Sequence, residues 1–527
     1  MALFVEQIMP IILTFFNGSN GCALLLPSLL LACLLLPTIL SFKAKRGRQL
    51  IRLPPGPPGL PILGHLHLLG SATHRSLADL SRRHGPLIYL RFGSIPVVVA
   101  SSPAIAKLIL QTHDHIFAWR PQPTVVKHLF GFKDVLFSQP DPYWKLMRQL
   151  YATDLFGPKR LRAFGPMIAE EVRAMLSTIA DSGPHKLVPV RATLYCANTN
   201  IIARMAIGKR LHELAPQISL ADPSHNLALL IGEVFQLLGV LNIGDYIPWL
   251  AFLDLQGYGR QSKALSLKLQ RLWQEVIDAR RSLRRQTNST APRELDFLDV
   301  LLSAAESNVE ISDFNIKAIL CDIFGAGIET SASSTEWALS ELLTHPFIMK
   351  RLQEELESVV GGSRLVCESD VQQMPYLRAV VKETMRLHPV SPILAPHMAS
   401  QQCQLLDFDI PKNTHVYVNA WAIGRDPTIW DRPLEFRPER FLDSDVDVRG
   451  QHFHLLPFGS GRRRCPALSL GFSNVHIMLA NLIQVFDWST ENLPNLSEKF
   501  RLAMALEDPL VARASLKVSK HLLKEHV

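Results

Sequence analysis

Several familiar kinds of site are missing from this sequence. Its seven cysteines are an odd number and widely scattered, and no two of them form a C-x-x-C pair. A zinc ribbon or a dithiol redox motif is therefore not supported, and the scatter is typical of a reducing compartment, where most cysteines are small buried hydrophobes. No glycine run extends to G-x-G-x-x-G after a strand, so the sequence predicts no nicotinamide or flavin domain of its own.

Strong charge, repeats and low-complexity segments are also missing. The net charge of +8 is spread over 527 residues, with no dense basic run beside interleaved aromatics. This argues against nucleic acid and favours a basic surface that faces an acidic partner or a membrane. Hydrophobic residues make up 47% of the chain, which is ample for a large buried core.

The N-terminal region carries a long uncharged stretch. Residues 21–40 contain no charge, which is about the length needed to cross a bilayer, and five basic residues follow within 41–52. The positive-inside rule predicts that residues 1–20 form a short luminal segment and that the bulk of the chain is cytosolic. A cleaved signal peptide is the competing interpretation, but its basic residues would precede the apolar run. Residues 41–65 are interpreted as a basic stop followed by a proline-rich hinge, "LPPGPPGLP".

The remaining residues, 66–527, are interpreted as one catalytic domain, mainly α with minor β. Residues 87–102 have β-branched runs broken by Gly and Pro and predict a hairpin. Residues 312–345 predict one long helix that begins at a serine cap and ends before Pro346. Further helices are predicted over 374–388 and after Cys465, and the segment "HVYVNAWAIG" is predicted to be strand-like.

One cysteine stands out, in "FGSGRRRCPALSLGF" (458–472). A thiolate needs positive surroundings to stay deprotonated near neutral pH, and three preceding arginines and a helix N-terminus after Pro466 supply them. Cys465 is therefore a candidate metal ligand, and a single thiolate without companions favours haem over zinc. A buried inert thiol is the alternative that chemistry alone leaves open.

At this point the sequence resembles a known family, the cytochrome P450 superfamily, and its plant microsomal group in particular. "FGSGRRRCPA" is similar to the family's F-x-x-G-x-R-x-C-x-G haem loop. "AGIETS" (326–331), "KETMRLHP" (382–389), "FRPERF" (436–441) and "WKLMR" (144–148) match further family motifs in the same order. Each pattern is weak alone, but the five are collinear and cover nearly the whole chain from the proline hinge onward.

The resemblance implies a haem-thiolate monooxygenase of P450 fold that uses O2, with haem b as the cofactor. Cys465 would be the axial ligand of the iron. Residues matching the positions that hold the haem are Trp144, Arg148, His397 and Arg463. Glu329 and Thr330 would sit opposite the thiolate and relay protons, with small Ala326 and Gly327 letting the helix approach the haem. Residues with a structural role would be Glu383, Arg386 and Arg440.

One departure from the family pattern concerns the cysteine loop. The family usually has Gly two residues after the cysteine, where this chain has Ala467. Gly serves where the backbone comes close to another group or adopts a positive φ, so an alanine with negative φ would cost little.

The resemblance also implies partners and a location. Electrons would come from a separate NADPH-cytochrome P450 reductase that docks on the arginines around Cys465, and the protein would be a single-pass endoplasmic reticulum membrane protein. The predicted pocket is mainly apolar, lined by residues 113–139, 390–395 and 506–510 with Phe324 and Gly327. A small hydrophobic plant metabolite is expected, a flavonoid or phenylpropanoid first. The alternatives are a terpenoid hydroxylase, a haem-thiolate isomerase or dehydratase, and a non-enzymatic haem carrier.

Overall fold

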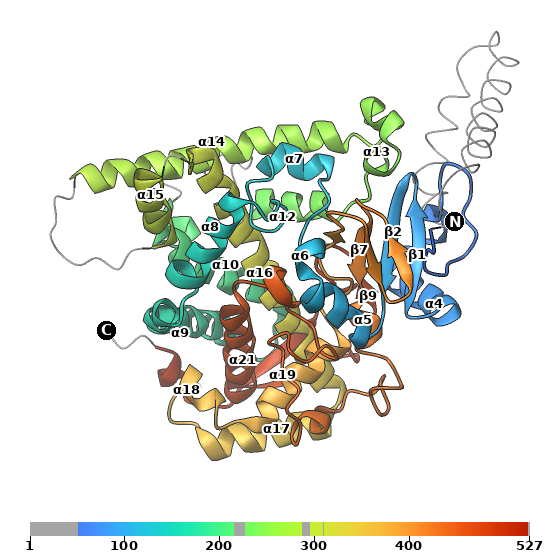
Figure 1. Ribbon diagram of the computed structural model, residues 1–527. Helices are drawn as coiled ribbons and strands as arrows, with labels where there is room; N and C mark the ends of the chain where they lie inside the picture. The colour runs from blue at the N-terminus through green and yellow to red at the C-terminus, as the bar shows by residue number, and fades with distance from the viewer. Residues whose placement is uncertain (1–50, 215–226, 287–295, 309, 525–527) are drawn as a thin grey trace, which may run out of the picture. The chain divides into compact units, whose positions relative to one another are not determined.

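The computed structural model describes residues 51–214, 227–286, 296–308 and 310–524 (Figure 1). The predicted membrane anchor at 21–40 lies outside the described residues. The chain divides into two compact units, each built from three separate stretches. Unit 1 takes in residues up to Pro121, Asn242–Gln256 and Ile393–Ile423, and unit 2 takes in Gln122–Leu241, Gly257–Pro392 and Gly424–Val527. The single domain expected over 66–527 stays a prediction.

Unit 1 is organised by a four-stranded sheet with the order β1-β2-β7-β4. β1 (Leu87–Phe92) and β2 (Ile95–Ala100) form the hairpin that the sequence predicts, with Leu87 opposite Ala100. Gly93 makes the turn with a φ of +57°, and a side chain there would collide with the Tyr246 carbonyl. β2 pairs in parallel with β7 (His415–Val418), which pairs with β4 (His397–Met398). The segment after β7 is a helical turn, α20 (Ala420–Ile423), because Asn419 caps it, so the strand-like prediction was wrong there.

The other elements of unit 1 are short and surround this sheet. The helices are η1 (Leu66–Leu68), α4 (Thr73–His84), α5 (Pro103–Lys107), η2 (Leu108–Thr112), α6 (Asp114–Phe117), α13 (Ile243–Tyr246), η5 (Pro248–Leu253) and α20 (Ala420–Ile423). The strands β5 (Cys403–Leu405) and β6 (Phe408–Ile410) form a separate antiparallel pair.

Unit 2 is built around one long helix, α16 (Asp313–Thr344), labelled near the middle of Figure 1. Ser312 and Asn315 form a capping box at its start, and it ends before Pro346, as the sequence predicts. Most of its residues are buried, on all sides of the helix, which is typical of a core helix. α10 (Val190–Ile207), α21 (Leu468–Val485), α14 (Tyr258–Gln286), α19 (Pro375–Leu387) and α12 (Leu227–Leu238) pack against it.

The remaining elements of unit 2 enclose this core. The helices are α7 (Thr124–Phe130), α8 (Pro142–Leu150), η3 (Tyr151–Leu155), α9 (Pro158–Ser182), α11 (Leu211–Leu214), α15 (Phe297–Ser307), α17 (Pro346–Val359), α18 (Glu368–Val371), η6 (Pro438–Phe441), η7 (Gly461–Arg463) and η8 (Lys520–Leu523). The sheets are β3 (Leu187–Pro189), β11 (Val511–Leu516) and β8 (Phe486–Ser489), and β9 (Glu498–Lys499) with β10 (Ala505–Leu506). The fold is mainly α with small sheets, as expected.

Two stretches of the described residues are long and apolar enough to cross a membrane, by length and composition only. Leu468–Val485 is 72% buried, as a core helix is, since core helices pass the same test. Leu229–Tyr246 is not one continuous helix, because α12 ends at Leu238 and α13 begins at Ile243. Neither stretch is therefore strong evidence for a membrane span.

Candidate active site

The cysteine loop folds as a tight turn that leads into α21. Gly459 and Gly461 both have a positive φ, +66° and +67°, which lets the chain reverse within a few residues. The Cys465 amide then donates to the Phe458 carbonyl at 2.9 Å. A side chain at Gly471, near the start of α21, would lie within 4 Å of two residues: Phe458 from the cysteine loop and Ser331 from α16. The loop therefore meets the middle of α16 at this point.

Cys465 lies in unit 2 and is part-buried. Burial raises the pKa of the thiol, because a thiolate loses hydration there. Three groups act in the opposite direction and favour the thiolate: a hydrogen bond from the Ala467 backbone amide and the positive charges of Arg148 and Arg464. The loop therefore directs a donor and two cations at a single sulfur atom.

Ala467 has a φ of −97° and forms the N-cap of α21. This conformation is open to any residue, so the usual glycine is not needed here for backbone reasons. The departure at this position therefore leaves the turn intact.

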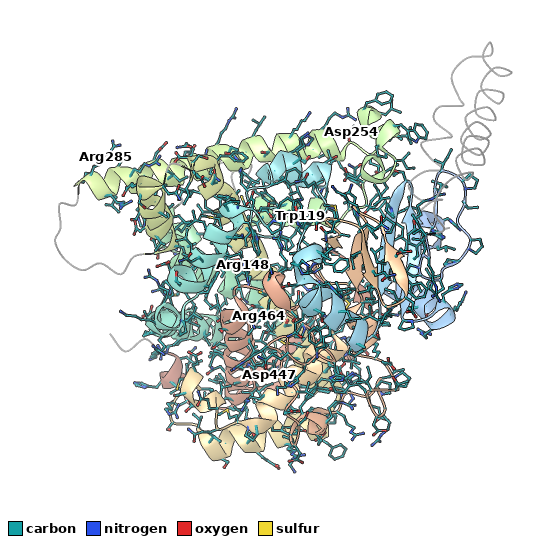
Figure 2. All side chains as sticks on the ribbon, viewed as in Figure 1. Trp119, Arg148, Asp254, Arg285, Asp447 and Arg464 are labelled. Carbon is teal, nitrogen blue, oxygen red and sulfur yellow. The ribbon has the colours of Figure 1, made fainter. Side chains whose placement is uncertain are left out.

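An arginine–tryptophan cluster lies beside the cysteine. Arg463 stacks on the Trp144 ring, with its guanidinium carbon 4.3 Å from the ring centroid, and Arg148 lies over the same ring at 5.8 Å. The Arg463 guanidinium also donates to the carbonyls of Val135 and Ser138, at 3.2 and 2.5 Å. Figure 2 labels Arg148 and Arg464 close to each other in unit 2, and burial lowers the pKa of Arg148.

Unit 2 thus brings together four of the five predicted haem residues, Cys465, Arg463, Arg148 and Trp144. The fifth, His397, belongs to unit 1. Its ring is buried there, with Nδ1 at 2.8 Å from the Phe117 carbonyl oxygen.

The structure shows two features of the predicted oxygen-activation segment, whose role at the haem stays a prediction. Gly327 lies against α10: a side chain there would meet Ile202 at 2.6 Å, so this glycine lets the two helices pack closely. Glu329 does not point the same way as Thr330 but toward α10, where Tyr195 and Arg191 influence its pKa. Neighbouring residues on a helix project about 100° apart, which explains the divergence.

The Thr330 side chain lies on the accessible part of α16. Its hydroxyl donates to the Ala326 carbonyl at 2.7 Å, and Ala326 is exposed while Gly327 and Thr330 are part-buried. α16 therefore carries a short accessible strip with one hydroxyl, in the middle of an otherwise buried helix.

The E-x-x-R motif forms a buried ion-pair network. Arg386 donates from Nε and Nη2 to both oxygens of Glu383, at 2.7 and 2.8 Å, and both side chains are fully buried. Arg440 adds a third bond to Glu383 at 3.0 Å, and the Arg437 amide adds a fourth at 2.8 Å. Arg386 also donates to the Pro433 carbonyl, so the network joins α19 to the 433–440 segment.

Unit 2 also contains a carboxylate cluster that no sequence motif indicates. Asp322 on α16 accepts a hydrogen bond from the Val135 amide at 3.2 Å. Burial, together with the nearby charge of Asp134, raises the pKa of Asp322 to about 8. The positive charge of Arg148 acts on the same carboxylate and lowers its pKa in part. Asp322 looked like an ordinary polar helix residue because its partners are far away in the sequence.

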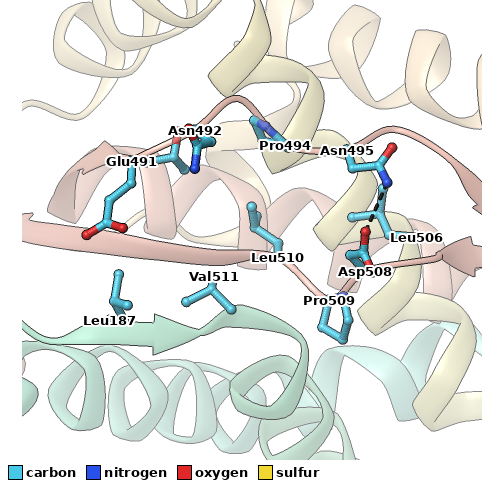
Figure 3. Close-up of a pocket in the computed structure, with 11 residues that line it drawn as sticks. Leu187, Glu491, Asn492, Pro494, Asn495, Leu506, Asp508, Pro509, Leu510 and Val511 are labelled. Carbon is cyan, nitrogen blue, oxygen red and sulfur yellow. Dashed lines mark hydrogen bonds between the residues drawn. The ribbon is translucent and has the colours of Figure 1, made fainter.

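A pocket of about 240 Å³ opens on the surface of unit 2, between the 490–495 segment and β11 (Figure 3). Leu506 and Leu510, from the predicted substrate-lining segment 506–510, contribute to its wall, and Asn495 donates to Asp508 at its rim. The lining contains none of the predicted haem residues. Phe130 and Phe137, in another predicted lining segment, are buried within unit 2.

The donor set fits haem. Within the described ranges, no three His, Cys, Asp or Glu side chains gather so that they could hold a metal ion. A metal bound by Cys465 would therefore need a group that brings its own ligands, as a porphyrin does with its four nitrogens. The stacked arginines suit the carboxylates of such a group, and the accessible strip of α16 suits a flat ring.

Comparison with known proteins identifies the family. The sequence model of the family "Cytochrome P450" matches residues 54–510. A flavonoid 3′-monooxygenase of Crocosmia x crocosmiiflora is 40% identical over 473 residues, 87% of this chain and 90% of that protein. A beta-amyrin 24-hydroxylase of Glycine max is 40% identical over 491 residues, 90% and 94% of the two chains. A solved zebrafish cytochrome P450 with progesterone matches with a TM-score of 0.70 at 28% identity, over 84% of this chain and 99% of that one.

Proposed function

The chain belongs to the cytochrome P450 family and is a monooxygenase, and we propose that it hydroxylates a small hydrophobic plant secondary metabolite, with a flavonoid or phenylpropanoid favoured. The observation that supports oxidation chemistry best is the single Cys465 thiol with the Ala467 amide, Arg148 and Arg464 directed at it. The substrate class is supported by the flavonoid-hydroxylating relatives and by the aromatic residues of segment 113–139.

The family implies a haem cofactor, and we assign haem b. Cys465 would ligate its iron, Arg148 and Arg463 would pair with its carboxylates, Trp144 would hold both arginines, and His397 would supply a further contact. Haem, when bound, supplies oxygen binding and O–O cleavage, which an axial thiolate favours. The chain's own contribution at the sulfur is to hold its negative charge, through the Ala467 amide and two arginines.

Proton supply is assigned to Thr330 and Glu329. The Thr330 hydroxyl lies on the accessible strip of α16, where it can exchange its bond to the Ala326 carbonyl for a bond to water. Glu329 has a pKa raised by burial and can therefore release or take up a proton nearer to neutral pH than an ordinary carboxyl. The buried network of Glu383, Arg386 and Arg440 is assigned a structural role only.

Electrons are proposed to come from NADPH-cytochrome P450 reductase. The cysteine loop presents the exposed Arg462 and Arg464, and Lys145 is exposed on α8. These charges suit an acidic flavoprotein, because complementary charge speeds docking.

Membrane attachment is proposed through residues 21–40 as a single pass in the endoplasmic reticulum, with the catalytic part in the cytosol. Unit 1 supports a membrane-facing surface, since Trp249, Phe252 and Leu253 are 60%, 82% and 47% exposed. Large apolar side chains at such exposure suit contact with lipid.

Two spectra and one oxygen measurement test these assignments. The full chain in microsomes, reduced and treated with carbon monoxide, is expected to give the strongly red-shifted Soret band of thiolate-ligated haem, and Cys465→Ser is expected to lose it. With reductase present, a flavonoid or phenylpropanoid should give a hydroxylated product in step with oxygen consumption. A band at the position typical of histidine-ligated haem would contradict the role of Cys465.

One alternative substrate class has specific support. The beta-amyrin 24-hydroxylase relative is as similar to this chain as the flavonoid relative is, so a terpenoid panel belongs in the same screen. Product formation without oxygen consumption would instead indicate the isomerase or dehydratase, which does not need the proton supply assigned to Glu329 and Thr330.

A further inference from the structure

The segment between α7 and α8, residues 131–141, starts in an unfavourable backbone conformation (both helices are labelled in Figure 1). Its first two residues both have a positive φ, +53° for Gly131 and +58° for Phe132. Glycine adopts this conformation freely, but a bulky side chain such as phenylalanine rarely does, and then only where surrounding contacts hold it. The shape of the segment therefore depends on the contacts that its remaining residues make.

Val135 makes the central contacts of this segment. It is buried, and its amide donates to the Asp322 carboxylate of α16 at 3.2 Å. Its carbonyl accepts from the Trp144 indole at 3.1 Å and from the Arg463 guanidinium at 3.2 Å. The Ser138 carbonyl accepts a second bond from Arg463 at 2.5 Å. Val135 therefore connects a carboxylate of α16 to two of the predicted haem residues.

Asp322 is suited to hold this residue in place. Its carboxyl offers an accepting oxygen whether it is protonated or ionised, so the bond to Val135 does not depend on its charge. Asp322 precedes Ala326 by four residues and Thr330 by eight, so it lies on the same side of α16 as the accessible strip. A side chain next to the predicted reaction site thus fixes the backbone to which Arg463 and Trp144 are bonded.

We propose that Asp322 is a positioning residue for the haem: it holds Val135 so that the Val135 and Ser138 carbonyls fix the Arg463 guanidinium. The inference rests on the proposed pairing of Arg463 with the haem carboxylates. A long arginine side chain has many rotamers, and ordering it costs conformational entropy. A guanidinium that is already held by two carbonyls and the Trp144 ring loses less of this entropy when it binds a carboxylate.

Hydrogen–deuterium exchange of the full chain tests the contact itself. Asp322→Leu keeps a side chain of similar size but has no acceptor, whereas Asp322→Asn keeps an accepting oxygen. Exchange of a peptide that covers residues 131–139 is expected to be about tenfold faster in Asp322→Leu, because a buried amide loses its partner. It should stay near the parent rate in Asp322→Asn. Equal exchange in the parent and Asp322→Leu would overturn the contact.

Haem release tests the positioning role. The haem-loaded full chain is mixed with an excess of a haem-free globin, and the Soret band reports the transfer. Asp322→Leu is expected to release haem about tenfold faster than the parent, and Asp322→Asn is expected to restore the parent rate. A parent-like rate in Asp322→Leu would overturn the role of Asp322.

Asn481→Leu is the matched control, because the Asn481 side-chain oxygen also accepts from a backbone amide, that of Val366 at 3.1 Å, and both residues are buried. Asn481 lies on α21 and has no bond to the 131–141 segment among its hydrogen bonds within the described residues. This variant is expected to lower the melting temperature but to keep haem release within about twofold of the parent. If it releases haem as fast as Asp322→Leu at a similar melting temperature, general destabilisation explains the effect and the positioning role is overturned.

A cycle with Arg463→Gln separates this inference from the proposed function. Arg463→Gln alone is expected to speed haem release, and Asp322→Leu should then add less than about twofold, because no guanidinium remains to be fixed. Fully additive effects would overturn the route through Arg463. If Arg463→Gln alone leaves haem release unchanged, the proposed pairing of Arg463 with haem fails, whereas hydrogen exchange still tests the bond between Asp322 and Val135.

Discussion

Two carboxylates of unit 2, Glu383 and Glu329, differ in how many hydrogen bonds they accept and how deeply they are buried. Glu383 accepts two bonds from Arg386, one from Arg440 and one from the Arg437 amide, and it is fully buried. Glu329 is half-buried, and the arginines of its neighbourhood, Arg191 and Arg501, act on it only through longer-range charge.

The difference separates a structural carboxylate from one that can exchange a proton. Each oxygen of Glu383 is fixed by N–H donors, so protonation would leave several donors without an acceptor. Glu329 has fewer bonds to lose, and its raised pKa brings its two protonation states closer in free energy. Four experiments can break or sharpen this comparison.

The largest effect is expected from Arg386→Ala, which leaves Glu383 charged and buried. Removing one partner of a buried ion pair costs about 3–5 kcal/mol, so the free energy of unfolding should fall by this amount and haem content should fall with it. Chemical denaturation of the purified protein measures the first and the Soret absorbance per protein the second. A variant as stable as the parent would show that Glu383 is not held as the structure has it.

Glu329→Gln should instead lower catalysis and spare the fold. The rate of product formation is expected to fall about 100-fold, within the range for loss of a general acid–base group. Since burial disfavours the ionised carboxylate, the neutral amide should leave the melting temperature near or above that of the parent at neutral pH. A large fall in melting temperature would place Glu329 with Glu383 as a structural group.

Asp322 offers an intermediate case, because its pKa is raised to about 8 by burial and by Asp134. The unfolded chain ionises this group near pH 4, whereas the fold keeps it protonated. Its contribution to stability is therefore complete at low pH and is lost as the pH rises toward 8 and beyond. Asp322→Asn should flatten the decline in melting temperature between pH 5 and 9, and an equally steep decline would contradict this assignment.

The smallest effect is expected from Ala467→Gly, which changes the backbone and no carboxylate. Because the φ of this residue is −97°, a glycine would relieve no backbone strain in the folded protein. It would, however, increase the conformational entropy of the unfolded chain. Unfolding free energy should fall by about 1 kcal/mol or less, with the carbon monoxide spectrum unchanged. A gain in stability or haem content would show that the alanine methyl crowds the site.

Much of the fold could be predicted because its signals are local. The capping serine at 312 and Pro346 bound α16 within one residue of the prediction, and Gly93 marks the hairpin turn. The Glu383–Arg386 contact was predictable from a spacing of three on a helix. The division into two units was not, since each unit combines stretches that are far apart in the chain.

The candidate site was predicted in its residue types more than in its contacts. Cys465 and its arginines are neighbours in the sequence, so their electrostatic relation could be inferred directly. The direction of Glu329 could not, because it depends on how closely α10 approaches Gly327. Asp322 and Asp134 were missed for the same reason: 188 positions separate them, and nothing in either segment indicates the other.

The sequence by itself determined what is set by near neighbours: helix ends, the hairpin, the charged surroundings of Cys465 and the pairing within E-x-x-R. Tertiary structure alone decided which carboxylates have all their oxygens hydrogen-bonded and which have a raised pKa. The physical reason is that a pKa depends on burial and on every charge within a few ångströms, and in a folded chain most of those neighbours come from distant segments. Arg191 acquires its place beside Glu336 only when α10 packs on α16.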